Sequence, residues 1–162
     1  MKDKLYKMMS WPQIEAIVYG EEGKPQTILG RHYISAYTLY QCFIPNAESV
    51  NLIIEGDKKK IAMEMADEAG FFAIAILGKE LRDYKYEVHY KENGTETIYD
   101  PYSFECAMNA KDISAWKKGV SRDAYRFMGA HYTSINGVDG VVFRVWAPNA
   151  VRVSVIGVFI NP

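Results

Sequence analysis

Acid–base chemistry in this chain would have to come from its 20 carboxylates and three histidines. A retaining glycosidase, for example, holds two carboxylates about 5–5.5 Å apart. The carboxylates here stand in predicted turns and on the polar sides of alternating segments, and no pair is set apart by its pattern. The motifs GxSxG, GxGxxG, HExxH and the P-loop do not occur. No catalytic residue is therefore predicted.

The histidines and cysteines do not form a predicted metal site, because none stands at ligand spacing from another. His32 and His131 occupy equivalent positions of a repeat, which favours a structural turn over an active site. His89 lies on the polar side of a predicted strand and is expected to be solvated. Cys42 and Cys106 are interpreted as two free, buried thiols. No metal or cofactor is predicted.

Aromatic residues are the compositional outlier, at 14% of the chain with 12 tyrosines. They suit a β-rich core or a sugar-binding surface, because flat ring faces stack on sugar rings. Tyr84 and Tyr86 alternate with polar residues, which favours core packing. Trp146 is interpreted first as a packing residue between modules, and Trp116 as an anchor for a short helix. The candidate carbohydrate-binding residues are Trp146, Tyr84 and Tyr86.

Charge and hydropathy exclude several function classes. Lys plus Arg number 19 and Asp plus Glu 20, giving a net charge of −1, which disfavours a nucleic-acid partner. No apolar run reaches the ~18–20 residues of a membrane helix, and the N-terminus leads into no secretory signal. We therefore expect no membrane partner and a cytoplasmic location.

The chain contains an internal repeat. Residues 29–35 (LGRHYIS) return as 128–134 (MGAHYTS), and 42–53 return as 145–156 with Pro-Asn-Ala intact. The offset is 99 at the first block and 103 at the second, which predicts a loop four residues longer within 135–140. The second copy ends after 35 residues, so we expect the chain to be a fragment cut inside its second module.

Hydrophobic alternation predicts short strands rather than long helices. A helix is predicted from Ser10 to about Val18, with Gly20 as its stop. Helices are also predicted from Asp112 to Gly119 and from Ser121 to Gly129. The strands predicted in the first copy are 38–44, 50–54, 71–77, 84–90 and 95–99, and those in the second copy are 143–147 and 153–155. In the strand 38–44, Tyr40, Cys42 and Ile44 are expected on the buried face. Asn93-Gly94 is a hairpin signal between the strands 84–90 and 95–99.

This pattern predicts an all-β fold: an immunoglobulin-like β-sandwich with short helices, followed by a truncated second sandwich of the same type. The predicted division is a helical lead-in at 1–28, a first sandwich at 29–105, a helical connector at 106–127 and the first strands of a second sandwich at 128–162. Strands within 143–159 would expose unpaired edges. We therefore expect the second module to pack on the first, to self-associate between chains or to be disordered.

Three stretches of the second copy resemble bacterial 1,4-α-glucan (glycogen) branching enzymes. They are 128–132 (MGAHY), 137–150 (GVDGVVFRVWAPNA) and 153–157 (VSVIG). Asp100-Pro101-Tyr102-Ser103-Phe104 and the connector at 112–125 resemble the same family. The Trp-Ala-Pro-Asn-Ala stretch is similar to a wider set of α-glucan enzymes, and the tandem copy narrows the resemblance to branching enzymes.

The resemblance implies two N-terminal sandwiches, the second of the glycogen-binding CBM48 type, then a (β/α)₈ barrel of the glycoside hydrolase 13 kind. The barrel would transfer α-1,4 glucan chains to 6-hydroxyls in glycogen biosynthesis, through an Asp nucleophile and a Glu acid/base. Both would lie beyond Pro162, so this segment would be inactive by itself. The implied partner is an α-glucan, such as glycogen or amylose, bound through the parent enzyme.

The resemblance ends at Gly157. The family continues Gly-Asp-Phe-Asn towards a sugar-stacking Trp, whereas this chain reads Gly157-Val158-Phe159-Ile160-Asn161-Pro162 and lacks that Trp. Two other interpretations stay open. One is a free-standing α-glucan-binding or interaction module, and the other is the N-terminal segment of a debranching enzyme.

Overall fold

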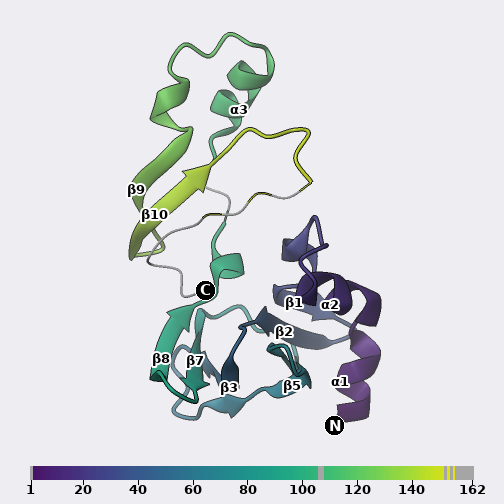
Figure 1. Cartoon of the computed structure of the whole chain (residues 1–162). Coiled ribbons are helices and arrows are strands. Elements are labelled where there is room, and N and C mark those ends of the chain that lie inside the picture. The colour runs from purple at the N-terminus through teal and green to yellow at the C-terminus, as the bar shows by residue number, and fades with distance from the viewer. Residues whose placement is uncertain (1, 106–107, 152, 154, 156–162) are drawn as a thin grey trace. The chain divides into compact units, whose positions relative to one another are not determined.

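The computed structural model describes residues 2–105, 108–151, 153 and 155. The chain forms two compact units, Met1–Phe104 and Glu105–Pro162, and each is described by itself. Figure 1 shows the first unit as strands with two short helices and the second as a helix and a hairpin. The predicted all-β class is confirmed by the antiparallel sheets of the chain.

The first unit begins with two helices. The predicted helix is confirmed as α2 (Trp11–Val18), with Ser10 at its N-cap and Gly20 in the left-handed region at φ 69°. The sequence analysis missed α1 (Lys2–Met8), which precedes it. A 3-10 turn, η1 (Pro25–Thr27), then leads into the first strand.

Eight strands form two four-stranded antiparallel sheets. The first sheet has the order β1-β2-β6-β5 and the second has the order β4-β3-β7-β8. Their bounds are β1 (Gly30–Ile34), β2 (Tyr37–Phe43), β3 (Ala47–Ile54), β4 (Ile61–Ala62), β5 (Glu64–Asp67), β6 (Phe71–Leu77), β7 (Tyr84–Tyr90) and β8 (Gly94–Tyr99). The second sheet ends in a 3-10 turn, η2 (Pro101–Ser103).

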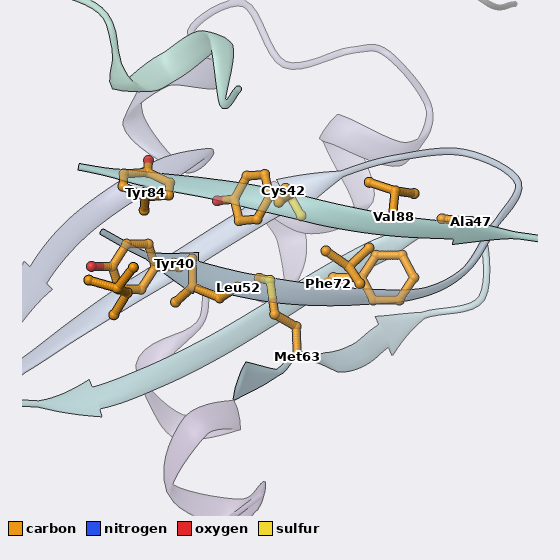
Figure 2. Close-up of a cluster of buried hydrophobic side chains, with 11 residues drawn as sticks. Tyr40, Cys42, Ala47, Leu52, Met63, Phe72, Tyr84 and Val88 are labelled. Atoms are coloured by element: carbon orange, nitrogen blue, oxygen red, sulfur yellow. The ribbon is translucent and has the colours of Figure 1, made fainter. Parts of the chain in front are cut away.

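The inner faces of the two sheets enclose the main core. It contains the predicted inward residues of β2, β3 and β7, together with Phe72 of β6 and Met63, as Figure 2 shows. The buried members are Tyr40, Cys42, Ala47, Val50, Leu52, Ile54, Met63, Phe72, Tyr84, Tyr86 and Val88. Period-two alternation therefore identified most of this core from sequence.

A second core lies on the other face of the sheet that contains β2 and β6. There Leu39, Phe71 and Ala73 are all 0% exposed and pack with Leu5 of α1 and Ile14 of α2. The prediction that only the Tyr40 face of β2 is buried is therefore incomplete. The reason is that α1 and α2 cover the face that alternation assigned to the outside.

The second unit starts with α3 (Ala110–Lys117), followed by the 3-10 turn η3 (Ala124–Arg126) and the strands β9 (Gly129–Ile135) and β10 (Val138–Arg144). The helix begins earlier than the predicted Asp112, because the side chain of Asn109 caps it by accepting from Lys111 N at 2.9 Å. The predicted helix after Ser121 is wrong, since only the short turn η3 forms there.

The four extra residues of the second copy lengthen the paired ladder and not the loop. β1 and β2 pair from Gly30↔Gln41 to Ile34↔Tyr37, and β9 and β10 pair from Gly129↔Arg144 to Ile135↔Val138. Both hairpins have a two-residue turn, Ser35-Ala36 and Asn136-Gly137, with positive φ at both positions. The prediction of a longer loop is therefore wrong, and the paired ladder is two residue pairs longer instead, with seven pairs in the second copy against five in the first.

The expected next strand of the second copy is not formed at Val153 or Val155, which are described outside any strand. The rest of that segment, like Cys106, lies outside the described residues. Within the described part of the second unit, the sheet consists of β9 and β10 alone.

The repeat extends further towards the N-terminus than the sequence comparison indicated. At the end of α2, Gly20 N donates to Ile17 O, and at the end of α3 the equivalent Gly119 N donates to Trp116 O. Both glycines have φ near 69°. The turns η1 and η3 also stand 99 residues apart. Each copy therefore opens with a helix, a 3-10 turn and a hairpin, in the same order and spacing.

Candidate functional site

Two tryptophans of the second unit meet beside an open groove. The Trp116 and Trp146 rings are 6.2 Å apart between centroids and lie edge to face at 71°. Trp116 also meets Phe127 edge to face at 6.3 Å. Trp146, two residues beyond β10, is 52% exposed, while Trp116 is half-buried. Edge-to-face pairs of this kind hold ring orientation while leaving part of each ring free.

Local sequence signals explain the position of both rings. Asn109 starts α3 and Gly119 ends it, so Trp116 falls in the last turn of the helix. Arg144, at the end of β10, donates from Nη1 to Phe127 O at 3.2 Å. This bond ties the segment after α3 to the strand that leads to Trp146.

The groove between these rings has a volume of ≈380 Å³. Its lining is Trp116, Lys117, Gly119, Ser121 and Trp146. Two indoles supply apolar faces and N–H donors, Ser121 supplies a hydroxyl, and Lys117 supplies three donors. We name this the tryptophan groove. Among the described residues, its lining includes no carboxylate and no histidine, and its side chains offer apolar faces and hydrogen-bond donors to a ligand.

The first unit has the same two positions without the tryptophans. By the repeat offsets, Ile17 of α2 corresponds to Trp116, and Phe43 of β2 corresponds to Trp146. Ile17 belongs to the core between the helices and the sheet, and Phe43 packs against that core. The tryptophan groove therefore lies in the second unit at the positions where the first unit packs α2 on its sheet, with two indoles in place of Ile17 and Phe43.

The other two candidate carbohydrate-binding residues lie in the core of the first unit. Tyr84 is 4% exposed and Tyr86 is 1% exposed, and their rings pack edge to face at 5.6 Å. Rings so deeply buried offer no face to a sugar. The structure therefore corrects the carbohydrate-binding role considered for Tyr84 and Tyr86 and supports the core packing that alternation favoured.

A buried carboxylate holds the hydroxyls of these two tyrosines. Asp100 is 1% exposed, and its Oδ2 accepts from Tyr84 Oη at 2.6 Å and Tyr86 Oη at 3.0 Å. Its Oδ1 accepts from Tyr102 N at 2.9 Å and so caps η2. Burial raises the pKa of both tyrosines, and the charge of Asp100 adds to it. The sequence analysis singled out Asp100 only as part of a stretch that resembles the family, and it did not predict this tertiary contact.

The histidines take structural positions. His32 Nε2 lies 3.0 Å from Leu29 O, and His131 Nε2 lies 2.8 Å from Met128 O. Both stand in strands, β1 and β9, rather than in the turn that the repeat suggested. Both histidines contact the backbone carbonyl three residues before them, and this shared contact supports a structural role for the two equivalent positions.

His89 belongs to a polar network on the outer face of the second sheet. Its Nδ1 lies 2.8 Å from Thr95 Oγ1, and its Nε2 lies 3.1 Å from Glu87 Oε1. Glu87 also pairs with Lys60 and accepts from Asn51 at 3.1 Å. The Lys60 contact is the main cause that lowers the pKa of Glu87. His89 was expected to be solvated, and the network that holds it was missed because Asn51 of β3, Thr95 of β8 and Lys60 join β7 only in the folded sheet.

The structure shows neither a reactive thiol nor a metal site among the described residues. Cys42 is buried and free, and burial raises the pKa of its thiol well above the usual value. Among the described residues, no cluster of three or more His, Cys, Asp or Glu side chains could hold a metal ion. No helix in the described part of the chain is long and apolar enough to span a membrane.

Comparison with known families places the chain. The model of the alpha-1,4-glucan branching enzyme GlgB N-terminal domain matches residues 10–102, and that of carbohydrate-binding module 48 (isoamylase N-terminal domain) matches residues 127–162. Because the first match covers more than half of the chain, the chain belongs to the family of GlgB N-terminal domains.

The relatives found by sequence are named 1,4-alpha-glucan branching enzyme GlgB. The protein of Shewanella sp. (strain MR-4) is 37% identical over 148 residues, which is 89% of this chain and 20% of that protein. The protein of Rhizobium meliloti (strain 1021) is 35% identical over 152 residues, 94% of this chain and 20% of that protein. The chain spans about a fifth of the length of the curated relatives it matches.

Among solved structures, a pullulanase from Bacillus acidopullulyticus is 28% identical over 46% of this chain and 10% of that chain, with a TM-score of 0.40. At that TM-score the likeness supports no conclusion about fold or function.

Proposed function

We propose that this chain is the non-catalytic N-terminal segment of a 1,4-α-glucan branching enzyme acting in glycogen biosynthesis. The observation that carries the proposal is the family match over residues 10–102, with 35–37% identity to the GlgB relatives across most of the chain. The parent would move α-1,4 glucan chains onto 6-hydroxyls, with its catalytic carboxylates outside this segment. The expected location is the cytoplasm, where such glucan stores would be made.

Within this segment, the proposed point of contact with an α-glucan is the tryptophan groove. Trp146 offers the most exposed indole, and Lys117 and Ser121 stand beside it as hydrogen-bond donors. The match of residues 127–162 to a carbohydrate-binding module supports this assignment. Glucan bound here would keep the polymer near the parent's active site.

The domain boundaries are also a proposal. The predicted division at 28, 105 and 127 separates the helices from the sandwiches. The equal order and spacing of α2-η1-hairpin and α3-η3-hairpin favours counting each helix with the hairpin that follows it. On that division the modules start at Ser10 and Asn109.

The experiment compares the full-length gene product with this 162-residue chain on amylose. Iodine staining and a count of α-1,6 linkages by ¹H NMR report branching. We expect branches from the full-length protein and none from the segment. The absence of branches from the full-length protein would overturn the proposal, and release of linear chains from a branched glucan would favour a debranching parent.

A second candidate function is a free-standing α-glucan-binding module, favoured by the exposed indole of Trp146. Calorimetric titration with maltoheptaose tests it. Binding by the chain, together with a gene that encodes no barrel, would favour this candidate over the segment of an enzyme.

Self-association of the chain is a further proposal. In the hairpin, Tyr132 of β9 is 94% exposed and Val141 of β10 is 43% exposed. Exposed apolar strands tend to recruit partners. Analytical ultracentrifugation from 5 to 500 µM would detect a dimer, and a monomer throughout would exclude it.

A further inference from the structure

A second pocket lies at one end of the first unit's sandwich. Its volume is ≈760 Å³, within the range of roughly 300–1,000 Å³ that is usual for small-molecule sites. Three turns surround it: the one before β3, the one between β5 and β6, and the one between β7 and β8. We name this the end pocket.

Backbone irregularities are concentrated at the end pocket. The pairing of β3 with β7 shifts register between Ala47 and Ser49, and the pairing of β5 with β6 shifts between Met65 and Asp67. Asn46, which also lines the pocket, has a φ of 65°. Bulges of this kind end strand pairing and redirect side chains, and they are frequent beside binding sites.

The lining combines apolar surface with oxygen and amide groups. Tyr90 is half-buried and packs against the main core, and Met65 is 38% exposed. Amide groups come from Asn46 and Asn93. Carboxylates come from Glu48, Glu68 and Glu92, and Lys91 supplies the one ammonium group of the lining.

This chemistry selects among ligand classes. Three carboxylates against one ammonium repel an anion, so a phosphate or a nucleotide is disfavoured. Carboxylate and amide oxygens accept hydrogen bonds from hydroxyls, and amide N–H groups donate to hydroxyl and ring oxygens. An aromatic ring and a thioether suit the apolar face of a sugar. The set fits a neutral ligand rich in hydroxyls.

We propose that the end pocket is a second glucan-binding site, which takes a segment of an α-glucan chain independently of the tryptophan groove. In naming an α-glucan, the inference rests on the proposed function. The first unit thereby contributes a glucan contact of its own, although its Ile17 and Phe43 positions lack the indoles of the second unit.

The test is a ¹⁵N NMR titration of the whole 162-residue chain with maltoheptaose. We expect saturable shifts in the amides of the end pocket, including Glu68, Tyr90 and Asn93, besides those around Trp146. An equal concentration of sorbitol serves as the control. No shifts at the pocket amides, or equal shifts with sorbitol, would overturn the inference.

A blocking variant sharpens the test. Ala69 is exposed and lines the pocket, so Ala69→Arg fills the space, and the nearby carboxylates hold the guanidinium there. We expect at least a tenfold loss of affinity at the pocket, with the Trp146 shifts unchanged. Ala62→Arg, at an exposed strand position outside the lining, is the matched control and should leave both sets intact.

The outcomes separate the two proposals. Branching by the full-length protein without maltoheptaose shifts at the end pocket would leave the proposed function standing and overturn the inference. Shifts at the pocket that Ala69→Arg does not reduce would also overturn it, since the ligand would then lie elsewhere. Shifts with calcium chloride and none with maltoheptaose would identify a cation site and reject the glucan. The two results can also diverge in the other direction. If the pocket amides shift saturably but the full-length protein forms no branches, the inference is supported and the proposed function is rejected.

Discussion

Gln41 and Arg144 stand at equivalent positions of the two units, and each donates a side-chain hydrogen bond to an equivalent backbone carbonyl. Gln41 Nε2 donates to Ile28 O at 2.7 Å, and Arg144 Nη1 donates to Phe127 O at 3.2 Å. Different side chains thus tie the 3-10 turn to the second strand of the hairpin in both copies. The hydrogen bond is present in both copies although glutamine makes it in one and arginine in the other. This indicates that the bond holds the end of the 3-10 turn against the hairpin that follows it.

The first prediction concerns the tryptophan groove. Replacing both indoles with the residues of the first unit, Trp116→Ile and Trp146→Phe, should lower the affinity for maltoheptaose at least tenfold, because the exposed ring faces are lost. A ¹⁵N NMR titration followed at the amides around residue 146 measures the effect, because it separates this groove from the end pocket. Tyr132→Ala removes a 94% exposed ring outside the groove and should leave the affinity unchanged. Equal affinity in the double variant would contradict the assignment.

The second prediction concerns the glycine between β5 and β6. Gly70 has a φ of 110°, and a Cβ placed there would lie 2.3 Å from Ile44 O. Gly70→Ala should therefore lower the free energy of unfolding by about 3 kcal/mol or more, from backbone strain and steric overlap together. Gly78→Ala is the control, since Gly78 has a φ of 96° with open space around it and should cost only about 1–3 kcal/mol. Urea denaturation measures both, and equal losses would reject the steric term.

The third prediction concerns the buried carboxylate. Asp100→Ala leaves two tyrosine hydroxyls and the Tyr102 amide without their acceptor, which should cost roughly 3 kcal/mol or more of unfolding free energy. Tyr84→Phe removes a single hydroxyl and should cost less. A loss in Asp100→Ala no larger than that in Tyr84→Phe, measured by chemical denaturation, would show that the shared acceptor is unimportant.

The fourth prediction is a pH dependence. Hydrogen bonds from Arg82 lower the pKa of Glu80 from 4.5 to about 2. A carboxyl with a lower pKa in the folded state adds stability above its unfolded pKa and loses it as the pH falls. Glu80→Gln should therefore lower Tm at pH 6, and the difference should disappear as the pH falls from 4.5 towards 2. Glu21→Gln serves as a carboxylate control, and a difference that persists at pH 2 would contradict the linkage.

Sequence reasoning succeeded where one local signal decides the structure. Alternation placed the inward residues of β7, and Ser10 with Pro12 placed the start of α2. It failed where a second layer intervenes. The outer face of β2 is buried because α1 covers it, and a seven-residue helix at the chain start gave too weak a pattern to be predicted.

The candidate site was predicted in part. Trp146 was singled out as an aromatic, but its contact with Trp116 depends on how the end of α3 meets the segment after β10, which no spacing rule provides. The end pocket was not predictable, because its lining comes from three turns that are distant in sequence. Asp100 was noticed as part of a motif, and its tyrosine partners became visible only in the folded sheet.

The hairpin formed by β9 and β10 limits how the length of this module can change. Successive residue pairs of an antiparallel ladder alternate between hydrogen-bonded and non-hydrogen-bonded, and a two-residue turn with positive φ closes only one of these two kinds. Adding one residue pair would put the turn next to a pair of the kind that it cannot close. Adding two residue pairs puts the turn next to a pair of the original kind again. Four residues are therefore the smallest insertion that keeps both the turn and the ladder, and they are the number that separates the two copies. Insertions and deletions in this hairpin among related genes should accordingly come in steps of four.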